Sequence, residues 1–195
     1  MTALTLKSPV LARLTDEEFY QFCADNRDWR IERDASHQIS IMPPTSSETG
    51  ASNSELGRQL ANWNVDTESG KTFDSSAGFT LDTGAMLSPD ASWIAWERWN
   101  ALSPDDRRGF ARICPDFVVE LLSPTDRLTD TMRKMEHWLA AGAKLGWLIA
   151  PGTESVYLFE PGQPVRPVVG FDQELVAGPV LPGFALELRW LRAGE

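Results

Sequence analysis

The sequence predicts a single domain of mixed α/β (α+β) class, in which helices flank a central β-sheet. The chain has 195 residues, 42% of them hydrophobic and 24% charged, which is enough to bury one sizeable core. Runs with strand character are mixed with helical patterns along the whole chain. The order strand, helix, strand from Phe117 to Ile149 is typical of a parallel crossover. No repeat, low-complexity tract or linker divides residues 1–195.

The N-terminal third predicts a helix, a hairpin and a second helix. Thr15 and Glu18 have the spacing of a capping box, and the helix that they start runs to about Asp25. Two alternating runs, 29–33 and 38–42, flank a polar turn and predict the hairpin. Apolar residues recur at helical spacing over 54–65, in a helix that begins as early as Glu48.

The middle of the chain predicts strands over 72–81 and 86–94 and a short helix over 96–102. The run 117–122 is the most apolar, and apolarity on both faces predicts the centre of the sheet. The elements expected after it are a helix over 128–143, a buried strand over 147–149, a hairpin of 156–160 and 164–169, and a last strand within 182–188.

Glu120 lies inside the apolar run Phe117-Val118-Val119-Glu120-Leu121-Leu122. A buried carboxylate without a partner costs several kcal/mol, so the fold must supply one. The candidates are a basic side chain, backbone donors, a metal ion, or water at a strand end.

Asp90 and Lys134 are candidates for the same site as Glu120. If neighbouring strands carry Asp90 and Glu120 on one face, their oxygens can hold Mg²⁺, which binds oxygen ligands and polarises phosphodiesters. A nearby ammonium group, from Lys134 in the following helix, would stabilise charge on phosphate. The structural alternative is that Asp90 caps a turn, Glu120 is half-exposed and Lys134 is solvated.

A family resemblance rests on these same residues. SPDASW, CPDFVVELLSP, the helix with Lys134-Met135-Glu136 and GWLIAP occur in the order typical of the Uma-two family of restriction-endonuclease-like proteins. The resemblance extends from RIERD through MPPTSSETG to LPGFALEL. It implies the fold of PD-(D/E)xK nucleases, with a mixed central sheet, flanking helices and a carboxylate-bound Mg²⁺. The N-terminal and C-terminal hairpins predicted from the alternating runs are expected as additions to this fold.

The resemblance implies roles for four residues. Asp90 matches the metal-binding Asp of the family, and Glu120 matches its second acidic residue. Leu122 stands where the usual nuclease pattern has Lys, and Lys134 matches families in which that lysine has moved to the next helix. Glu32, in RIERD, matches a further acidic residue that completes the site.

Other polar residues near these motifs receive structural interpretations. Ala150 departs from the family, which commonly has Asp there, and a turn role for that Asp is favoured because Pro151-Gly152 follows. Asp116 is expected to mark the entry of the central strand, with a ligand role as the alternative. Ser123 and Asp126 are expected to cap the helix that follows.

Composition excludes several classes of site. Two cysteines and two histidines cannot form a disulfide framework or a histidine-rich metal centre. The net charge of −10 argues against broad electrostatic attraction to nucleic acid, although a metal-dependent nuclease site is itself built of carboxylates. No membrane span or signal peptide is evident, so a cytoplasmic protein is expected.

Two functional hypotheses follow. The first is a Mg²⁺-dependent endonuclease, with Mn²⁺ as a possible substitute, that hydrolyses DNA with Asp90, Glu120, Lys134 and Glu32. The second is a non-catalytic binding or oligomerisation module that retains the fold. It is motivated by the acidic surface and by a hairpin expected to expose Tyr157 and Phe159. A homodimer or higher homo-oligomer is expected under either hypothesis.

Overall fold

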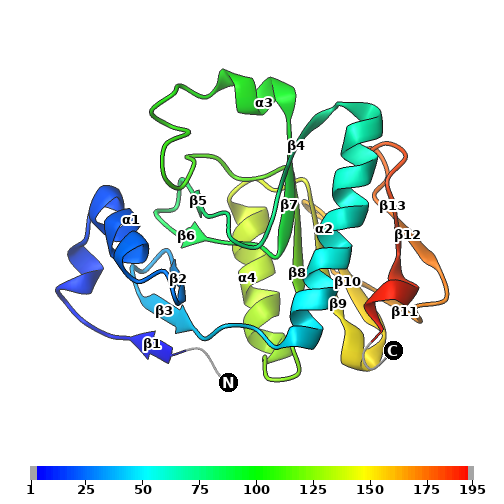
Figure 1. The fold of residues 1–195 in the computed structure, drawn as a ribbon, viewed down its shortest axis with the longest axis horizontal. Coiled ribbons are helices and arrows are strands. Elements are labelled where there is room, and N and C mark those ends of the chain that lie inside the picture. Colours follow the sequence, from blue (N-terminus) through cyan, green and yellow to red (C-terminus); the bar gives the residue numbers. More distant parts are fainter. Residues whose placement is uncertain (1–3, 193–195) are drawn as a thin grey trace.

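A mixed six-stranded sheet forms the centre of the computed structural model, which describes residues 4–192 (Figure 1). Its strand order is β11-β10-β9-β8-β7-β4. The strands are β4 (Gly70–Phe73), β7 (Ala91–Ala95), β8 (Phe117–Leu121), β9 (Leu145–Ala150), β10 (Ser155–Phe159) and β11 (Arg166–Val169). Only β8 and β9 pair in parallel within this sheet, so the predicted crossover and the central place of β8 are confirmed.

Helices cover both faces of this sheet (Figure 1). Helix α4 (Leu128–Ala140) makes the crossover from β8 to β9 and buries Met135 and Trp138. Helix α2 (Ser47–Thr67) packs on the other face through Leu56 and Leu60, in one core with Val119 of β8. Short helix α3 (Trp96–Ala101) follows β7 directly. The 3₁₀ turns are η1 (Leu11–Arg13), η2 (Pro151–Thr153) and η3 (Leu188–Leu191).

A second sheet and a helix form an N-terminal layer beside the central sheet (Figure 1). Its strands run in the order β1-β3-β2-β6-β5. They are β1 (Leu4–Leu6), β2 (Arg30–Arg33), β3 (Ile39–Met42), β5 (Phe79–Thr80) and β6 (Met86–Leu87). Helix α1 (Asp16–Asp25) starts with the predicted capping box of Thr15 and Glu18. Phe19 of α1, Ile31 of β2 and Ile39 of β3 share its small core.

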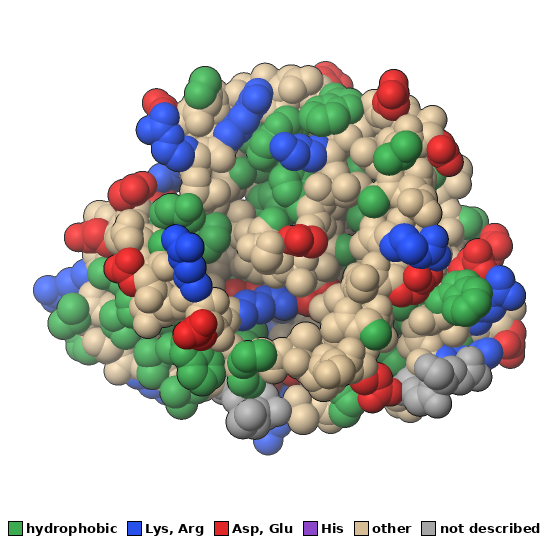
Figure 2. Space-filling model, viewed as in Figure 1, with side chains coloured by type: hydrophobic (Ala, Val, Ile, Leu, Met, Phe, Trp, Pro, Cys, Tyr) green, Lys and Arg blue, Asp and Glu red, His purple; other side chains and the backbone are tan. Residues whose placement is uncertain are grey.

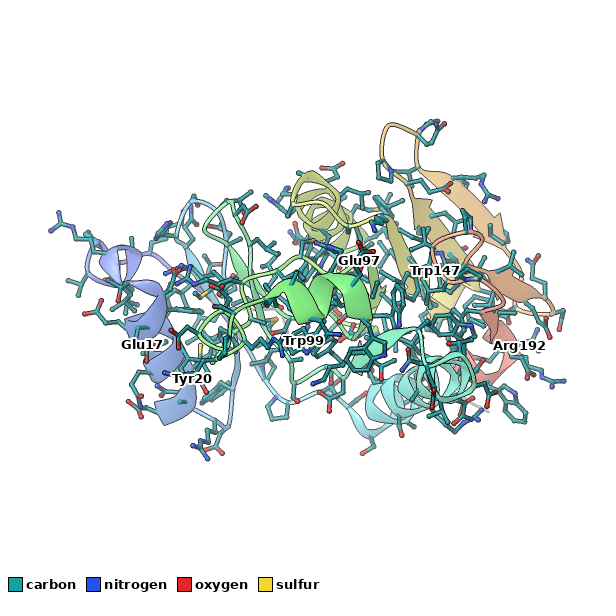
Figure 3. All side chains as sticks on the ribbon, turned by 90° about the horizontal axis from the view of Figure 1, so that it is seen from above. Glu17, Tyr20, Glu97, Trp99, Trp147 and Arg192 are labelled. Atoms are coloured by element: carbon teal, nitrogen blue, oxygen red, sulfur yellow. The ribbon has the colours of Figure 1, made fainter. Side chains whose placement is uncertain are left out.

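The C-terminal segment closes the α2 side of the central sheet. Strands β12 (Glu174–Val176) and β13 (Ala185–Glu187) form a separate pair. Phe184 stacks on the buried Trp147 of β9 with ring centroids 5.9 Å apart, and Figure 3 shows Trp147 among the densely packed side chains beside β9. This aromatic packing fixes the C-terminal strands against the sheet.

The expectation of one sheet is wrong for the middle of the chain, where residues 72–94 contribute strands to two different sheets. The predicted strand 72–81 is two strands, β4 and β5, and an Asp74 turn with Ser76 follows β4. The predicted strand 86–94 is likewise divided into β6 and β7. Pro89 lacks a backbone N–H and cannot continue the hydrogen-bond ladder, so the chain changes sheets there. The break at 88–90 thereby places polar groups between the two sheets.

Candidate active site

Asp90 and Glu120 lie beside each other at the carboxyl end of β8. Ala91 of β7 is paired with Val119 of β8, so the preceding Asp90 falls next to Glu120. The backbone N–H of Leu121 donates to Asp90 Oδ2 at 2.7 Å, and the N–H of Asp90 donates to Val119 O at 2.9 Å. Asp90 is 8% exposed and Glu120 is 4% exposed.

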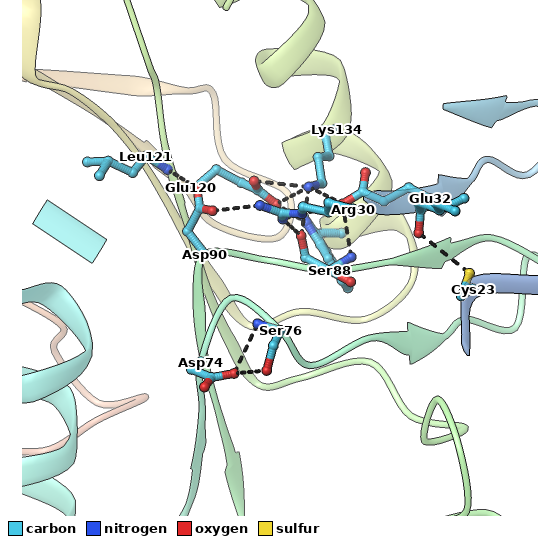
Figure 4. A network of polar contacts seen from close by, with 12 residues as sticks. Cys23, Arg30, Glu32, Asp74, Ser76, Ser88, Asp90, Glu120, Leu121 and Lys134 are labelled. Atoms are coloured by element: carbon cyan, nitrogen blue, oxygen red, sulfur yellow. Dashed lines mark hydrogen bonds and ion pairs between the residues drawn. The ribbon is translucent and has the colours of Figure 1, made fainter. Parts of the chain in front are cut away.

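Lys134 and Glu32 reach the same place from two other elements (Figure 4). Lys134, on α4, has Nζ 2.9 Å from Glu120 Oε1 and 2.8 Å from Glu32 Oε1. It also donates to the backbone oxygen of Ser88 at 2.9 Å. Glu32, on β2, accepts the Ser88 N–H at 3.1 Å. The structure therefore brings all four predicted residues together, from β2, the start of β7, β8 and α4.

Two further side chains belong to this cluster and were not predicted from the sequence. Arg30 of β2 has Nη1 2.9 Å from Asp90 Oδ1 and Nη2 3.4 Å from Glu32 Oε1, and it donates to Ser88 O. Trp138 of α4 donates through Nε1 to Glu120 Oε1 at 2.9 Å. The spacing of both residues places them on the same face as a predicted site residue. Arg30 is two residues from Glu32 on a strand, and Trp138 is four residues from Lys134 on a helix.

Burial and charge oppose each other in setting the pKa values of these groups. Burial, with Asp90 as a neighbouring anion, raises the pKa of Glu120 to about 7 despite the contact with Lys134. Burial alone would raise the pKa of Glu32, but Lys134 and Arg30 outweigh it and lower that pKa below its usual range. Burial would lower the pKa of Lys134, and the contacts with Glu120 and Glu32 raise it instead. The two glutamates therefore titrate in different pH ranges.

The donor set suits a hard divalent cation that is completed by water and phosphate. Within residues 4–192 no three Asp, Glu, His or Cys side chains are arranged to hold a metal by themselves. Mg²⁺ does not need such a cage, because it is commonly bound by one or two carboxylates, several waters and substrate phosphates. Asp90 and Glu120 are the two adjacent carboxylates, and each still has unused lone pairs. The residues present therefore fit Mg²⁺ or Mn²⁺.

Asp116 lies at the opposite end of β8 and does not take part in this cluster. Its carboxylate is 1% exposed and contacts Arg98 at 3.0 Å and Lys144 at 2.8 Å. It also accepts the N–H of Ala95 at 3.0 Å. These contacts support the interpretation of Asp116 as a structural residue at the entry of the strand.

The loop after β8 differs in detail from expectation. Asp126 accepts the N–H of Ser123 at 2.9 Å, and neither side chain caps α4, whose N-cap is Arg127. Ala150 ends β9 and leads into η2, as a turn role at this position would require. Ala150 also lines a cleft of about 200 Å³, together with Leu122, Pro124 and the first turns of α2.

One face of the molecule has a hollow in its surface. Figure 2 shows this depression between the N-terminal layer and α2, with Lys or Arg and Asp or Glu side chains on its floor. The exposed side-chain fractions are 28% for Arg30 and 17% for Lys134, and 9% or less for the three carboxylates. Arg30 is therefore the side chain of the cluster that is most accessible to solvent.

Comparisons with known proteins show the family and the fold of this chain. The sequence model of a family described as "Uma2: Putative restriction endonuclease" matches residues 16–189. Among solved structures, a protein of Anabaena variabilis ATCC 29413, described as a putative nuclease belonging to DUF820, superposes with a TM-score of 0.71. The two chains are 22% identical over 83% of this chain and 90% of that chain, so this likeness shows the fold. No curated protein matches the chain.

Proposed function

The chain belongs to the Uma2 family of putative restriction endonucleases, and on that premise we propose that it is a Mg²⁺-dependent endonuclease that hydrolyses phosphodiester bonds in DNA. Mn²⁺ is the expected substitute ion. The observation that carries the proposal is the convergence of Asp90, Glu120, Lys134 and Glu32 from four separate elements. Buried ionisable groups gathered at the carboxyl end of a central strand are typical of a catalytic site.

Asp90 and Glu120 would hold the metal ion. Mg²⁺ held there would supply Lewis-acid polarisation of the phosphodiester and would lower the pKa of its bound water. The buried Trp138 holds Glu120 by a hydrogen bond, and the Leu121 N–H holds Asp90. Both carboxylates are thus oriented before any ligand arrives.

Lys134 would stabilise charge on the reacting phosphate or orient the attacking water. Its ammonium group lies within 2.9 Å of Glu120 Oε1, so it is held beside the expected metal ligand. Glu32 fixes that position through its 2.8 Å contact. A lysine supplied by α4 would allow the site to act with Leu122 in place of the strand lysine.

One of the two observations that favoured the non-catalytic alternative is not supported by the structure. Phe159 is only 4% exposed, and Tyr157 is half-buried, so the expectation of an exposed aromatic hairpin is wrong. Phe159 faces the core shared with α4. The acidic composition remains as a general feature, with a net charge of −10.

A plasmid nicking assay tests the proposed function. Wild-type protein with Mg²⁺ or Mn²⁺ is expected to convert supercoiled plasmid to open-circle DNA, and EDTA to stop the reaction. Asp90→Ala and Glu120→Ala are expected to reduce both nicking and Mn²⁺ binding in calorimetry, while Asp130→Ala, an exposed change on α4, retains both. Weak and equal metal binding in wild type and site variants would favour the non-catalytic module.

Assembly and compartment are separate proposals. No helix of the described part of the chain is long and apolar enough to cross a membrane. We retain a cytoplasmic homodimer as the expectation, and β11 is an open edge of the central sheet with Val169 71% exposed. Sedimentation equilibrium of wild type and Val169→Lys would test that edge.

A further inference from the structure

Arg30 crosses from the N-terminal layer to neutralise a metal-ligand candidate of the central sheet. Its guanidinium contacts Asp90 Oδ1 at 2.9 Å, although the two residues are 60 positions apart. Nη2 faces Glu32 Oε1 at 3.4 Å. Arg30 therefore spans Glu32 and Asp90 in the same way that Lys134 spans Glu32 and Glu120 (Figure 4).

The guanidinium occupies Oδ1 of Asp90, the carboxylate oxygen that the Leu121 N–H does not hold. Asp90 Oδ2 is directed at the Leu121 N–H, while Oδ1 accepts from Arg30. The Arg30 side chain is also the most exposed of the cluster, at 28%. A cation from solvent therefore has easier access to Arg30 than to Asp90, whose side chain is 9% exposed.

Arg30 keeps one buried donor without a partner in the described structure. Its Nε is buried and makes no hydrogen bond there, whereas both terminal nitrogens are engaged. An unpaired buried donor is destabilising. Guanidinium groups bind phosphate through two parallel N–H groups, and Nε with one Nη is a suitable pair.

Charge counting shows why a bound metal ion and a bound phosphate both favour a position of Arg30 away from Asp90. Three carboxylates face two cations here, so the ionised cluster has a formal charge of minus one. A divalent ion would change this to plus one and repel the guanidinium from Asp90. A phosphodiester brings one negative charge, which restores neutrality and provides Arg30 with a new partner.

We propose that Arg30 is an exchangeable counter-ion, which releases Asp90 to the divalent cation and then binds the phosphate of the nucleic acid. Metal and nucleic acid then bind cooperatively, because each favours the displaced position of Arg30. The phosphate half rests on the proposed function. The metal half, competition between Arg30 and a cation for Asp90, does not involve nucleic acid.

Calorimetric titration of Mn²⁺ into wild type, Arg30→Gln and Arg30→Lys tests the metal half. Arg30→Gln removes the competing charge and is expected to bind Mn²⁺ about tenfold more tightly, whereas Arg30→Lys retains wild-type affinity. Arg27→Gln, an exposed change just before β2, is the matched control and is expected to behave as wild type. Unchanged or weaker Mn²⁺ binding by folded Arg30→Gln would overturn the proposal. A purely structural role for Arg30 does not predict tighter binding.

The same titrations with a 12-base-pair DNA duplex present test the phosphate half. The duplex is expected to raise Mn²⁺ affinity at least tenfold in wild type and less than threefold in Arg30→Gln and Arg30→Lys, because only the guanidinium offers paired donors. Equal enhancement in all variants would overturn transfer to phosphate. If plasmid nicking fails while Arg30→Gln still tightens Mn²⁺ binding, the proposed function fails and the metal half stands.

Discussion

The two ends of β8 each bury a carboxylate, but they neutralise it differently. At the amino end, Asp116 alone faces both Arg98 and Lys144. At the carboxyl end, Glu120 shares Lys134 with Glu32, and Arg30 is divided between Glu32 and Asp90. One anion meets two cations at the first end, and three anions meet two cations at the second.

This difference in charge balance separates a structural carboxylate from a candidate catalytic one. Arg98 and Lys144, which contact Asp116, are 32% and 57% exposed, so solvent screens their charges. The charge of Asp116 is therefore balanced without a further ligand. The two cations of the cluster at Glu120 are only 28% and 17% exposed, and the cluster has an excess of negative charge, which a divalent cation would remove. The sequence shows an acidic residue near each end of PDFVVEL, but only the structure shows how many cations face each one.

Lys134→Met is expected to have the largest effect, a loss of nicking rate of about 100–1000-fold, which is typical when one donor that stabilises transition-state charge is removed. The matched change at the other end, Lys144→Met, is expected to leave the rate unchanged. Initial rates of plasmid nicking at saturating Mg²⁺ measure both. Equal rates for the two variants would remove the functional distinction between the ends of β8.

Glu120 is expected to make the metal-free protein less stable as pH rises. Its pKa is raised from 4.5 to about 7, so between these values the folded state binds more protons than the unfolded state. The stabilisation is complete below about pH 4.5 and is lost as pH rises through 7, with a total of about 3 kcal/mol at most.

Urea unfolding in EDTA at pH 5, 6, 7 and 8 measures this dependence. The free energy of unfolding of wild type relative to Glu120→Gln is expected to fall with pH. Glu55→Gln is the control, because the hydrogen bond from Arg58 lowers the pKa of Glu55 and its contribution changes only below this range. A constant difference between wild type and Glu120→Gln would show that Glu120 is ionised throughout.

The helices and the central strand could be predicted because their signals are local. The capping box of Thr15 and Glu18 and the apolar run of β8 need no tertiary information. The division of 72–81 and 86–94 between two sheets could not be predicted in the same way, because each half satisfies strand patterning alone. The choice of partner strand depends on residues far away in the sequence.

The acidic residues and the lysine of the site were predicted from the sequence, but Arg30 was not. Asp90, Glu120 and Lys134 stand in motifs whose order is informative, whereas Arg30 gives only an alternating strand pattern. Its contact with Asp90 joins two sheets, and their packing is a tertiary property. The likeness at 22% identity supports the fold, so the roles of these residues stay predictions.

Asp116→Asn is expected to destabilise the fold by about 1–2 kcal/mol without changing Mn²⁺ affinity. Removal of the charge leaves Arg98 and Lys144 without their shared anion, but both are accessible to water and the Asn oxygen can still accept the Ala95 N–H. Urea unfolding and Mn²⁺ calorimetry measure the two quantities. Weaker Mn²⁺ binding in a folded Asp116→Asn would show that the two ends of β8 are coupled.

Lys144→Met is expected to have the smallest effect on stability, less than about 1 kcal/mol. Lys144 is 57% exposed, and Arg98 still contacts Asp116 when it is removed, so no buried charge loses its last partner. Lys134 has no such substitute at Glu120, because Arg30 faces Asp90 and Glu32. Thermal unfolding of Lys144→Met and Arg98→Met measures this redundancy. A loss of several kcal/mol from either change would show that Asp116 needs both of its cations.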